Sequence, residues 1–347
     1  MFHLYEKINS GGIYVIAEMS ANHGGSLENA LLIVREAAKA GADCVKIQTY
    51  TADSITIDCD NEYFRIHGGL WDGYNLHDLY SEAGTPYEWH RAIMEECQKC
   101  GVDFLSTPFD PIAVDFLEEI GVEAYKIASF ELNDIPLIEY AAAKGKPMIM
   151  SCGMATIQDI QDAIDACKRV GNSQIVLLKC CSEYPANWAD MHLGNIPDMM
   201  NRFGVPVGLS DHSFGSIGAV VAVSLGANII EKHVKLDGVE SADSSFSMTM
   251  DEFAQMIKDA NNAKMIAKGP DYSLSNKERA STAFRRSLFA VKDIEVGDEI
   301  TTENVRSIRP SNGIRPKYLK EMLGKKAKTA VKRGQPITQA FFDELGE

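Results

Sequence analysis

Several features are missing from this chain of 347 residues, and each absence excludes a class of protein. No apolar run approaches the roughly 20 residues that span a membrane, and the N-terminus MFHLYEKINSGG lacks the basic and apolar regions of a secretory signal. The chain also lacks a basic excess: its formal net charge is −15, whereas nucleic acids and anionic membranes need a basic footprint. We therefore expect a cytoplasmic protein that binds neither nucleic acid nor membrane.

The eight cysteines lack the spacing of a zinc site. Cys97 and Cys100 form a C-x-x-C near the end of an Ala/Glu/Gln-rich helix, but no second pair stands at zinc spacing. Because small thiols pack well inside strands, we interpret a second group as core residues: Cys44, Cys152, Cys180 and Cys181. The cysteine usage fits a reducing compartment.

What the chain does contain is a repeated pattern of short apolar runs that end in polar clusters, each followed by a helix-like stretch. The runs occupy residues 14–23, 44–50, 103–109, 124–131, 147–153, 175–184, 206–213 and 229–235. A strand followed by an amphipathic helix, repeated eight times, predicts a parallel (β/α)₈ TIM barrel. Because the C-terminal strand ends of that fold carry the chemistry, the polar clusters predict one active site.

The length predicts a barrel with a small appendage, because a minimal barrel needs about 250 residues. We place the barrel at 1–269, a polar linker at 270–286 and a small, mostly β module at 287–347. The module repeats the phrases VKDIEVGDEIT and VKRGQPIT, and its size predicts that it docks on something else. A long loop at 51–86 follows the second run, as lids and binding walls do in such folds.

Two histidines at the ends of the seventh and eighth runs predict a metal site. His212 in GLSDHS and His233 in IIEKHVK would lie on adjacent strands, close enough to share one divalent ion. With two imidazoles only, the ion would keep positions for water and substrate, which suits Mn²⁺ or Mg²⁺. The alternative is a pair of hydrogen-bonded polar residues in the barrel mouth.

Three lysines interrupt apolar runs: Lys46, Lys126 and Lys179. A lysine inside a strand is costly unless its ammonium reaches solvent or an anion. Hydroxyl side chains at neighbouring run ends would help to cradle a phosphate and a carboxylate: Thr107, Ser129, Ser151, Ser182 and Ser210. A Schiff-base nucleophile and a buried structural ion pair are the alternatives for any one lysine.

Carboxylates complete the set of polar run ends. They are Glu18, Glu131, Asp211 and Glu231. A carboxylate at a barrel mouth can position water or act as acid or base, and it can equally orient a neighbouring Lys or His.

In combination these phrases resemble the sialic acid synthase family, whose members condense phosphoenolpyruvate with an amino-sugar aldehyde to build nonulosonic acids. IAEMSANHGGS, GADCVKIQTY, FLSTPFD, AYKIASFE, GKPMIMSCGMA, GLSDHS and EKHV occur in family order. The tail SLFAVKDIEVGDEITTENVRSIRPSNG resembles the family's antifreeze-protein-like, or SAF, domain. The resemblance implies a domain-swapped homodimer in which that domain caps the partner's barrel.

The resemblance also implies roles for individual residues. Metal binding would fall to His212 and His233. Contacts to phosphoenolpyruvate would come from Lys46, Thr107, Lys126, Ser129, Ser151, Ser182 and Ser210. The acceptor sugar would contact Glu18, Gln48, Trp71, Tyr184, Asp243 and, from the other subunit, Arg309. The catalytic set would be Glu18, Lys46, Lys126, Glu131 and His233. Many family members have Asn at the position of Ser182 and a CT pair at Cys180–Cys181, but a hydroxyl still donates to an anion.

Within the family, EMSANHGGS and the insert GGLWDGYNLHDLYSEAGTPYEWH resemble the branch that makes pseudaminic acid. The acceptor of that branch is 2,4-diacetamido-2,4,6-trideoxy-L-altrose, and an aromatic wall with Trp71 and Tyr74 suits its 6-methyl group. N-acetylneuraminate and legionaminic acid synthases of the same family are the alternatives. A Schiff-base aldolase and a non-catalytic sugar-binding protein are more distant ones.

Overall fold

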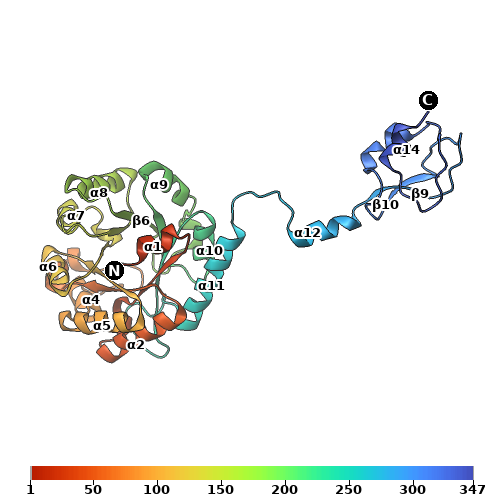
Figure 1. The fold of residues 1–347 in the computed structure, drawn as a ribbon. Coiled ribbons are helices and arrows are strands. Elements are labelled where there is room, and N and C mark those ends of the chain that lie inside the picture. The colour runs from red at the N-terminus through yellow and green to blue at the C-terminus, as the bar shows by residue number, and fades with distance from the viewer. Residues whose placement is uncertain (1, 347) are drawn as a thin grey trace. The chain divides into compact units, whose positions relative to one another are not determined.

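The computed structural model describes residues 2–346, and within them eight parallel strands close into a barrel surrounded by helices (Figure 1). Each strand pairs with the next along the chain, and β1 closes the ring by pairing with β8. The strands are β1 (Tyr14–Glu18), β2 (Cys44–Thr49), β3 (Asp103–Pro108), β4 (Tyr125–Ile127), β5 (Met148–Ser151), β6 (Ile175–Cys180), β7 (Val207–Asp211) and β8 (Ile229–His233). Each predicted run contains one strand, so the TIM-barrel prediction is confirmed.

An outer helix follows each strand of the barrel. These helices are α2 (Leu27–Ala40), α5 (His90–Cys100), α6 (Pro111–Ile120), α7 (Ile135–Ala142), α8 (Ile157–Arg169), α9 (Asn195–Phe203), α10 (Ile217–Ser224) and α11 (Met250–Ile266). Local signals set their ends: the Ser26 side chain accepts a hydrogen bond from the Asn29 amide at the start of α2. Gly41 ends that helix at φ 102°, a left-handed conformation that glycine adopts without strain.

The strands bury side chains on both faces, as parallel sheets do. The larger core lies between the sheet and the outer helices, and a smaller one fills the barrel near its N-terminal end. Leu4, from helix α1 (Leu4–Asn9), belongs to the smaller core and is fully buried. The strand residues of the smaller core are Tyr14, Ile16, Cys44, Leu105, Ile149, Val176, Leu178 and Ile229. Their two-residue spacing defines which positions face the barrel interior.

The long loop after β2 contains helices α3 (Ala52–Ile55) and α4 (Leu76–Ala83). Two buried histidines contact threonines at the two ends of this loop. His90 contacts the Thr49 hydroxyl at 2.7 Å, and His23 contacts the Thr85 hydroxyl at 3.4 Å. Burial lowers the pKa of each ring to about 4, so both are neutral anchors at physiological pH.

The chain divides into two compact units, Met1–Lys268 and Gly269–Glu347. In the second unit, β9 (Ser287–Ala290) pairs antiparallel with β10 (Val305–Ile308), and its helices are α12 (Asn276–Ser281), α13 (Leu319–Met322) and α14 (Gln339–Asp343). The two repeated phrases pair with each other, because Ile294 and Val331 exchange backbone hydrogen bonds of 2.9 Å. This unit has a core of its own around Leu288. Among the described residues, the helices are all too short or too polar to cross a membrane.

Candidate active site

The strand register brings most of the predicted site residues to one place, the C-terminal mouth of the barrel. They continue the interior two-residue series above the apolar layer: Glu18, Lys46, Gln48, Thr107, Lys126, Ser151, Ser210, Glu231 and His233. Lys179 is an exception, because it lies one position away from the interior residues Leu178 and Cys180 on β6. Its ammonium donates to the Cys180 carbonyl at 2.7 Å. Lys179 therefore belongs to the opposite face of the strand.

Two lysines and two glutamates form a buried charge cluster at the centre of the mouth. Lys46 Nζ lies 2.7 Å from Glu18 Oε2 and 3.7 Å from Glu231 Oε1. Lys126 Nζ lies 3.5 Å from the same Glu231 oxygen. All four side chains are at most 5 % exposed. The cluster is close to neutral as it stands, so an incoming anion must compete with the carboxylates for the lysines.

Burial and the neighbouring charges shift the pKa values in this cluster in different directions. Burial lowers the pKa of Lys126, and Glu231 offsets only part of the effect. Burial also acts to lower the pKa of Lys46, but Glu18 and Glu231 outweigh it and raise the value. The pKa of Glu231 is lowered, because Lys126 and Lys46 outweigh its burial. The mouth therefore holds a fixed Lys46 cation and a less firmly protonated Lys126.

Hydroxyl groups surround the charge cluster. Thr107 accepts from Lys46 Nζ at 3.4 Å, and Ser210 donates to Glu231 at 3.2 Å. Ser151 is buried, and its oxygen has no hydrogen-bond partner. Such an orphaned hydroxyl at the edge of a charged site is available to a ligand.

Gly153 brings two more of the predicted hydroxyls together. Its amide donates to Ser129 Oγ at 3.0 Å. A Cβ built on Gly153 would lie 2.0 Å from Ser182 Oγ and 2.8 Å from Ser129 Oγ, so only glycine fits between them. Nothing in the sequence marks Gly153 beyond its place in SCGMA after β5. Because Gly153 has no side chain, the hydroxyls of Ser129 and Ser182 both lie close to its Cα.

His212 and His233 lie next to each other, with ring centroids 5.4 Å apart. His212 Nδ1 lies 2.9 Å from the Cys181 carbonyl, so that nitrogen carries a proton, and the neutral ring offers the lone pair of Nε2. Burial opposes the charged form of His212, but Cys180 and the Cys181 carbonyl outweigh it and raise the pKa, so a bound ion would replace a proton on Nε2. His233 Nδ1 is buried without a hydrogen-bond partner. Burial, with the charge of His212 second, lowers the pKa of His233 well below its usual value and keeps this ring neutral.

These two imidazoles fit a divalent ion with open coordination positions. Both rings offer a nitrogen that the protein leaves free, and neutral imidazole is a common ligand for such ions. Among residues 2–346, no group of three or more His, Cys, Asp or Glu side chains is arranged to hold an ion. An ion held by the two imidazoles would complete its shell with water and substrate oxygens.

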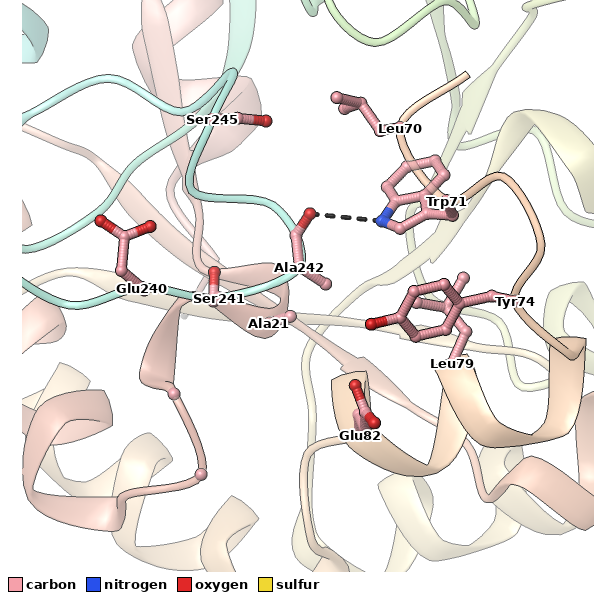
Figure 2. Close-up of a pocket in the computed structure, with 12 residues that line it drawn as sticks. Ala21, Leu70, Trp71, Tyr74, Leu79, Glu82, Glu240, Ser241, Ala242 and Ser245 are labelled. Atoms are coloured by element: carbon pink, nitrogen blue, oxygen red, sulfur yellow. Dashed lines mark hydrogen bonds between the residues drawn. The ribbon is translucent and has the colours of Figure 1, made fainter. Parts of the chain in front are cut away.

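Aromatic rings connect the histidines to the long loop after β2. The Tyr184 ring lies 4.3 Å from that of His212, and the Trp71 ring lies 5.9 Å from that of Tyr184, measured between centroids. Trp71 Nε1 donates to the Ala242 carbonyl at 3.3 Å, which joins the loop to the segment after β8 (Figure 2). Trp71 therefore reaches the mouth through Tyr184.

A chain of hydrogen bonds joins four polar side chains of the mouth. Gln48 donates to Glu18 Oε1 at 3.0 Å and to Ser20 Oγ at 3.2 Å, and Ser20 in turn donates to Asp243. Burial raises the pKa of Asp243, although the Ser20 contact opposes the shift. Sequence reasoning missed Ser20, whose backbone has a φ of 47°. Ser20 links Gln48 to Asp243, and Gln48 extends the chain to Glu18.

A cavity of about 540 Å³ adjoins Trp71 (Figure 2). Its walls come from the loops after β1, β2 and β8, and they combine aromatic, acidic and hydroxyl groups, including Trp71, Tyr74, Glu82, Glu240 and Ser241. A volume of this size is typical of small-molecule sites. Lys46 and Lys126 do not line the cavity, so it is a separate space beside Trp71 and not the centre of the mouth.

Glu131 and Arg309 also lie apart from the interior series. Glu131 is in the 3₁₀ turn Ser129–Glu131 directly after β4, and its Oε2 atom is buried without a hydrogen-bond partner. Burial raises its pKa to about 7, so the carboxyl can both give and take a proton near neutral pH. Arg309 lies in the second compact unit, directly after β10, and its side chain is exposed within that unit.

Comparisons with known proteins identify a family and a domain. Residues 33–271 match the NeuB family, and residues 285–343 match the SAF domain. A pseudaminic acid synthase from Campylobacter jejuni is 46 % identical over 95 % of this chain and 96 % of its own. An N,N'-diacetyllegionaminic acid synthase from Legionella pneumophila is 31 % identical over 93 % of each chain.

A solved structure shares the fold. An N-acetylneuraminic acid synthetase from Leptospira borgpetersenii, crystallised with citrate, is 31 % identical, with a TM-score of 0.69. The match covers 78 % of this chain and 90 % of that one. The resemblance read from the motifs is confirmed by the family match over most of the barrel and by the full-length relatives. The chain belongs to the NeuB family.

Proposed function

We propose that this chain is a pseudaminic acid synthase, which condenses phosphoenolpyruvate with 2,4-diacetamido-2,4,6-trideoxy-L-altrose to give a nonulosonic acid and phosphate. The identity of 46 % to a pseudaminic acid synthase, against 31 % to a legionaminic acid synthase, carries this choice within the family. N-acetylneuraminate and legionaminic acid synthesis are the alternatives, because the same barrel chemistry serves each acceptor.

The buried cations of the mouth support binding of phosphoenolpyruvate. Lys46 and Lys126 are the charged donors of the interior, and Thr107 lies 3.4 Å from Lys46 Nζ. The unpartnered Ser151 hydroxyl and the facing hydroxyls of Ser129 and Ser182 add neutral donors for phosphate or carboxylate oxygens. Fixed donors in a buried site hold both charges without reorganisation, which favours the condensation electrostatically.

We assign a divalent ion, Mn²⁺ or Mg²⁺, to His212 and His233. Bound there, the ion would supply Lewis-acid polarisation of the sugar aldehyde. The ring of His212 is oriented by the Cys181 carbonyl, and that of His233 lies between Phe246 and His212 at centroid distances of 5.1 and 5.4 Å. The protein thus holds both rings before any ligand arrives.

The reaction forms one C–C bond and breaks one link to phosphate. C3 of phosphoenolpyruvate bonds to the aldehyde carbon, and a water oxygen bonds to C2, after which phosphate leaves. Glu131 takes the proton that the water loses, since its unpartnered oxygen and its pKa of about 7 suit a base at neutral pH. That proton replaces the one that the aldehyde oxygen gains as it becomes a hydroxyl. The second water proton leaves the C2 hydroxyl as the C2–O bond to phosphate breaks and the C2 carbonyl forms, and it departs with phosphate as HPO₄²⁻.

The acceptor sugar would lie between the polar chain and the aromatic contact. Glu18, Gln48 and Asp243 offer oxygens and an amide to its hydroxyl and acetamido groups. Trp71 and Tyr184 offer apolar faces to its methyl group, and the adjoining cavity leaves room for a second acetamido group. Aromatic faces beside a few polar groups are typical of pockets for small ligands.

We also propose a cytoplasmic, domain-swapped homodimer in which Arg309 of one chain reaches the sugar in the other barrel. Charge supports this arrangement. Residues 269–347 contain 15 Lys or Arg and 11 Asp or Glu, a net charge of +4. Because the whole chain has a net charge of −15, residues 1–268 have a net charge of −19. A basic unit and an acidic barrel attract each other, which favours docking of one on the other.

Mixed dimers test the swap. Arg309→Ala chains and Lys46→Ala chains are each expected to be inactive alone. After subunit exchange, some activity should return, because one mouth of each mixed dimer then holds both intact residues. Exchange verified by mass analysis with no recovery would show that each tail serves its own barrel.

The function itself is tested by phosphate release from phosphoenolpyruvate in the presence of Mn²⁺. Phosphate release should require the diacetamido sugar. A non-catalytic sugar-binding protein would release no phosphate with any sugar. The lowered pKa of Lys126 makes the Schiff-base aldolase a specific rival. Borohydride with pyruvate should leave the mass of the protein unchanged, whereas a trapped adduct on Lys126 would favour the aldolase.

A further inference from the structure

A second buried ion pair lies just outside the barrel mouth, on the helix-facing side of β7 and β8. Lys232 Nζ lies 2.9 Å from Asp211 Oδ2, and the two side chains are 1 % and 0 % exposed. They follow the outward series of their strands, because Leu209 and Ile230, two residues earlier, belong to the core between sheet and helices. Lys232 therefore cannot reach a substrate in the barrel interior.

The pair is tied to the backbone on both sides of His212. Asp211 Oδ1 accepts from the Ser213 amide at 2.9 Å and from the Ser213 hydroxyl at 2.7 Å. Lys232 Nζ donates to the Ser213 carbonyl. Residues 211 and 213 are thus joined to each other and to Lys232, and His212 is the residue between them. Lys232 itself directly precedes His233.

Helix α10 packs directly on this network. A Cβ built on Gly218, near the start of α10, would lie 3.0 Å from Asp211 Oδ2 and 3.0 Å from Ser213 Oγ. The absence of a side chain at Gly218 lets the helix approach this closely. The ion pair is therefore closed off from water and has little freedom to change its geometry.

A fully buried ion pair is weak evidence for stability, because desolvation offsets most of the attraction between the charges. Its placement points to another role. Asp211 and Lys232 are partners in the β7–β8 register, and each is followed by one of the two facing histidines. Groups that support metal ligands from behind typically change metal affinity when they are removed.

We propose that Lys232 and Asp211 are positioning residues, which hold the rings of His212 and His233 at the separation that lets them share one divalent ion. The inference rests on the proposed function, because it uses the metal site assigned there. Neither residue touches the substrate. Their effect passes through the backbone at 211–213 and 232–233.

The test measures Mn²⁺ binding to the full chain by the loss of the free-ion electron paramagnetic resonance signal. Lys232→Met keeps the aliphatic stem but leaves Asp211 unpaired, so the Asp211→Asn/Lys232→Met double variant is used beside it in case the single variant fails to fold. His233→Ala removes a ligand. Leu117→Ala is the matched control, since Leu117 is fully buried on α6 and takes no part in the network.

The double variant should bind Mn²⁺ at least about 10-fold more weakly than the wild type, as removed supporting groups do at metal sites. Leu117→Ala should lose stability and keep the wild-type dissociation constant. His233→Ala should show no stoichiometric binding. Equal dissociation constants for wild type and double variant would overturn the positioning role, while the metal site itself would stand.

A second readout separates this inference from the proposed function. In metal-free protein labelled with ¹⁵N-histidine, His212 should show the Nδ1-protonated tautomer in the wild type and a mixture in the double variant. If the wild type binds no Mn²⁺, the proposed metal site fails, and the tautomer decides the inference alone. A mixture in the double variant then supports positioning, and an unchanged tautomer overturns it.

Discussion

The two ends of the barrel differ in whether their buried polar groups have hydrogen-bond partners. At the N-terminal end, on the side of the apolar layer away from the mouth, Asp103 accepts from the Tyr14 hydroxyl at 2.6 Å and from the His3 amide at 2.8 Å. At the mouth, buried atoms lack hydrogen-bond partners: Glu131 Oε2, Ser151 Oγ, Glu231 Oε2 and His233 Nδ1. Asn228 Oδ1 is an exception at the N-terminal end. Since folded proteins rarely leave such atoms unpaired, the mouth is the end that a ligand completes.

The two ends also differ in the burial of their ion pairs. The Lys7–Asp43 pair near the N-terminal end, at 2.7 Å, is partly exposed and joins α1 to the start of β2. The Lys46–Glu18 pair, also at 2.7 Å, is buried and lies beside further charges. Burial makes the second pair costly to keep, and the proposed ligand gives a reason for the cost.

Removal of the metal should have the largest effect. A chelator should abolish phosphate release, and Mn²⁺ should restore it. His233→Ala should lower kcat/KM by more than about 100-fold, beyond the loss seen for groups that only support metal ligands. It should stay folded and fail to respond to added Mn²⁺. His67→Ala, on the exposed loop, is the control and should behave as the wild type. Turnover that resists the chelator would refute the metal assignment.

Loss of a mouth lysine comes next. Lys46→Met should lower kcat/KM by about 10²–10³-fold, as removal of one electrostatic group does in other enzymes, because it takes away a charge held for the anionic substrate. Lys7→Met removes an ammonium at the same distance from a carboxylate, but at the other end of the barrel. It should change kcat/KM by less than about twofold. Similar losses in both variants would remove the functional distinction between the two ends.

Trp71→Ala should have an intermediate effect that appears as lost selectivity. The preference for the diacetamido sugar over N-acetylmannosamine should shrink by about 10-fold, the usual scale of one apolar mismatch. The preferred sugar should suffer more, since Trp71 reaches the mouth through Tyr184. Tyr63→Ala, at a 90 % exposed position of the same loop, should leave the preference unchanged. An unaltered ratio for Trp71→Ala would exclude Trp71 from the sugar site.

The smallest expected effect is one on stability, seen against pH in Glu131→Gln, a variant whose turnover should also fall because it lacks the proposed base. Burial raises the pKa of Glu131 from 4.5 to about 7. The folded state therefore binds more protons than the unfolded state between these values, and wild-type stability falls as pH rises through them. Urea unfolding should show the Gln variant gaining about 1–2 kcal/mol over the wild type between pH 5 and pH 8, after allowance for partial exposure. Equal differences at both pH values would contradict the assigned burial.

Much of the mouth could be predicted from sequence, because period-two alternation fixes which strand residues face inward. Lys46, Lys126 and Glu231 interrupt apolar runs in that phase, and the motifs of the family mark the same positions. Lys179 breaks the rule: it interrupts a run in the same manner but faces outward. A single apolar run buried on both faces carries no sign of which residues point inside.

Other parts of the site depend on contacts between distant segments, which the sequence does not reveal. The role of Gly153 appears only when Ser129 and Ser182 are seen on either side of it. No signal within EKHV marks Lys232, because its partner Asp211 lies on another strand. The path from Trp71 to the histidines likewise depends on how a long loop folds back over the mouth.

The central claim, that this mouth joins phosphoenolpyruvate to the 6-deoxy diacetamido sugar, is tested most directly by competition. Both 2,4-diacetamido-2,4,6-trideoxy-L-altrose and N-acetylmannosamine are offered at equal concentration in one reaction with phosphoenolpyruvate and Mn²⁺. The two products are then separated by mass, and their ratio gives the ratio of kcat/KM values. We expect the diacetamido product to dominate by at least about 10-fold. Comparable amounts of the two products, or an excess of N-acetylneuraminate, would contradict the account.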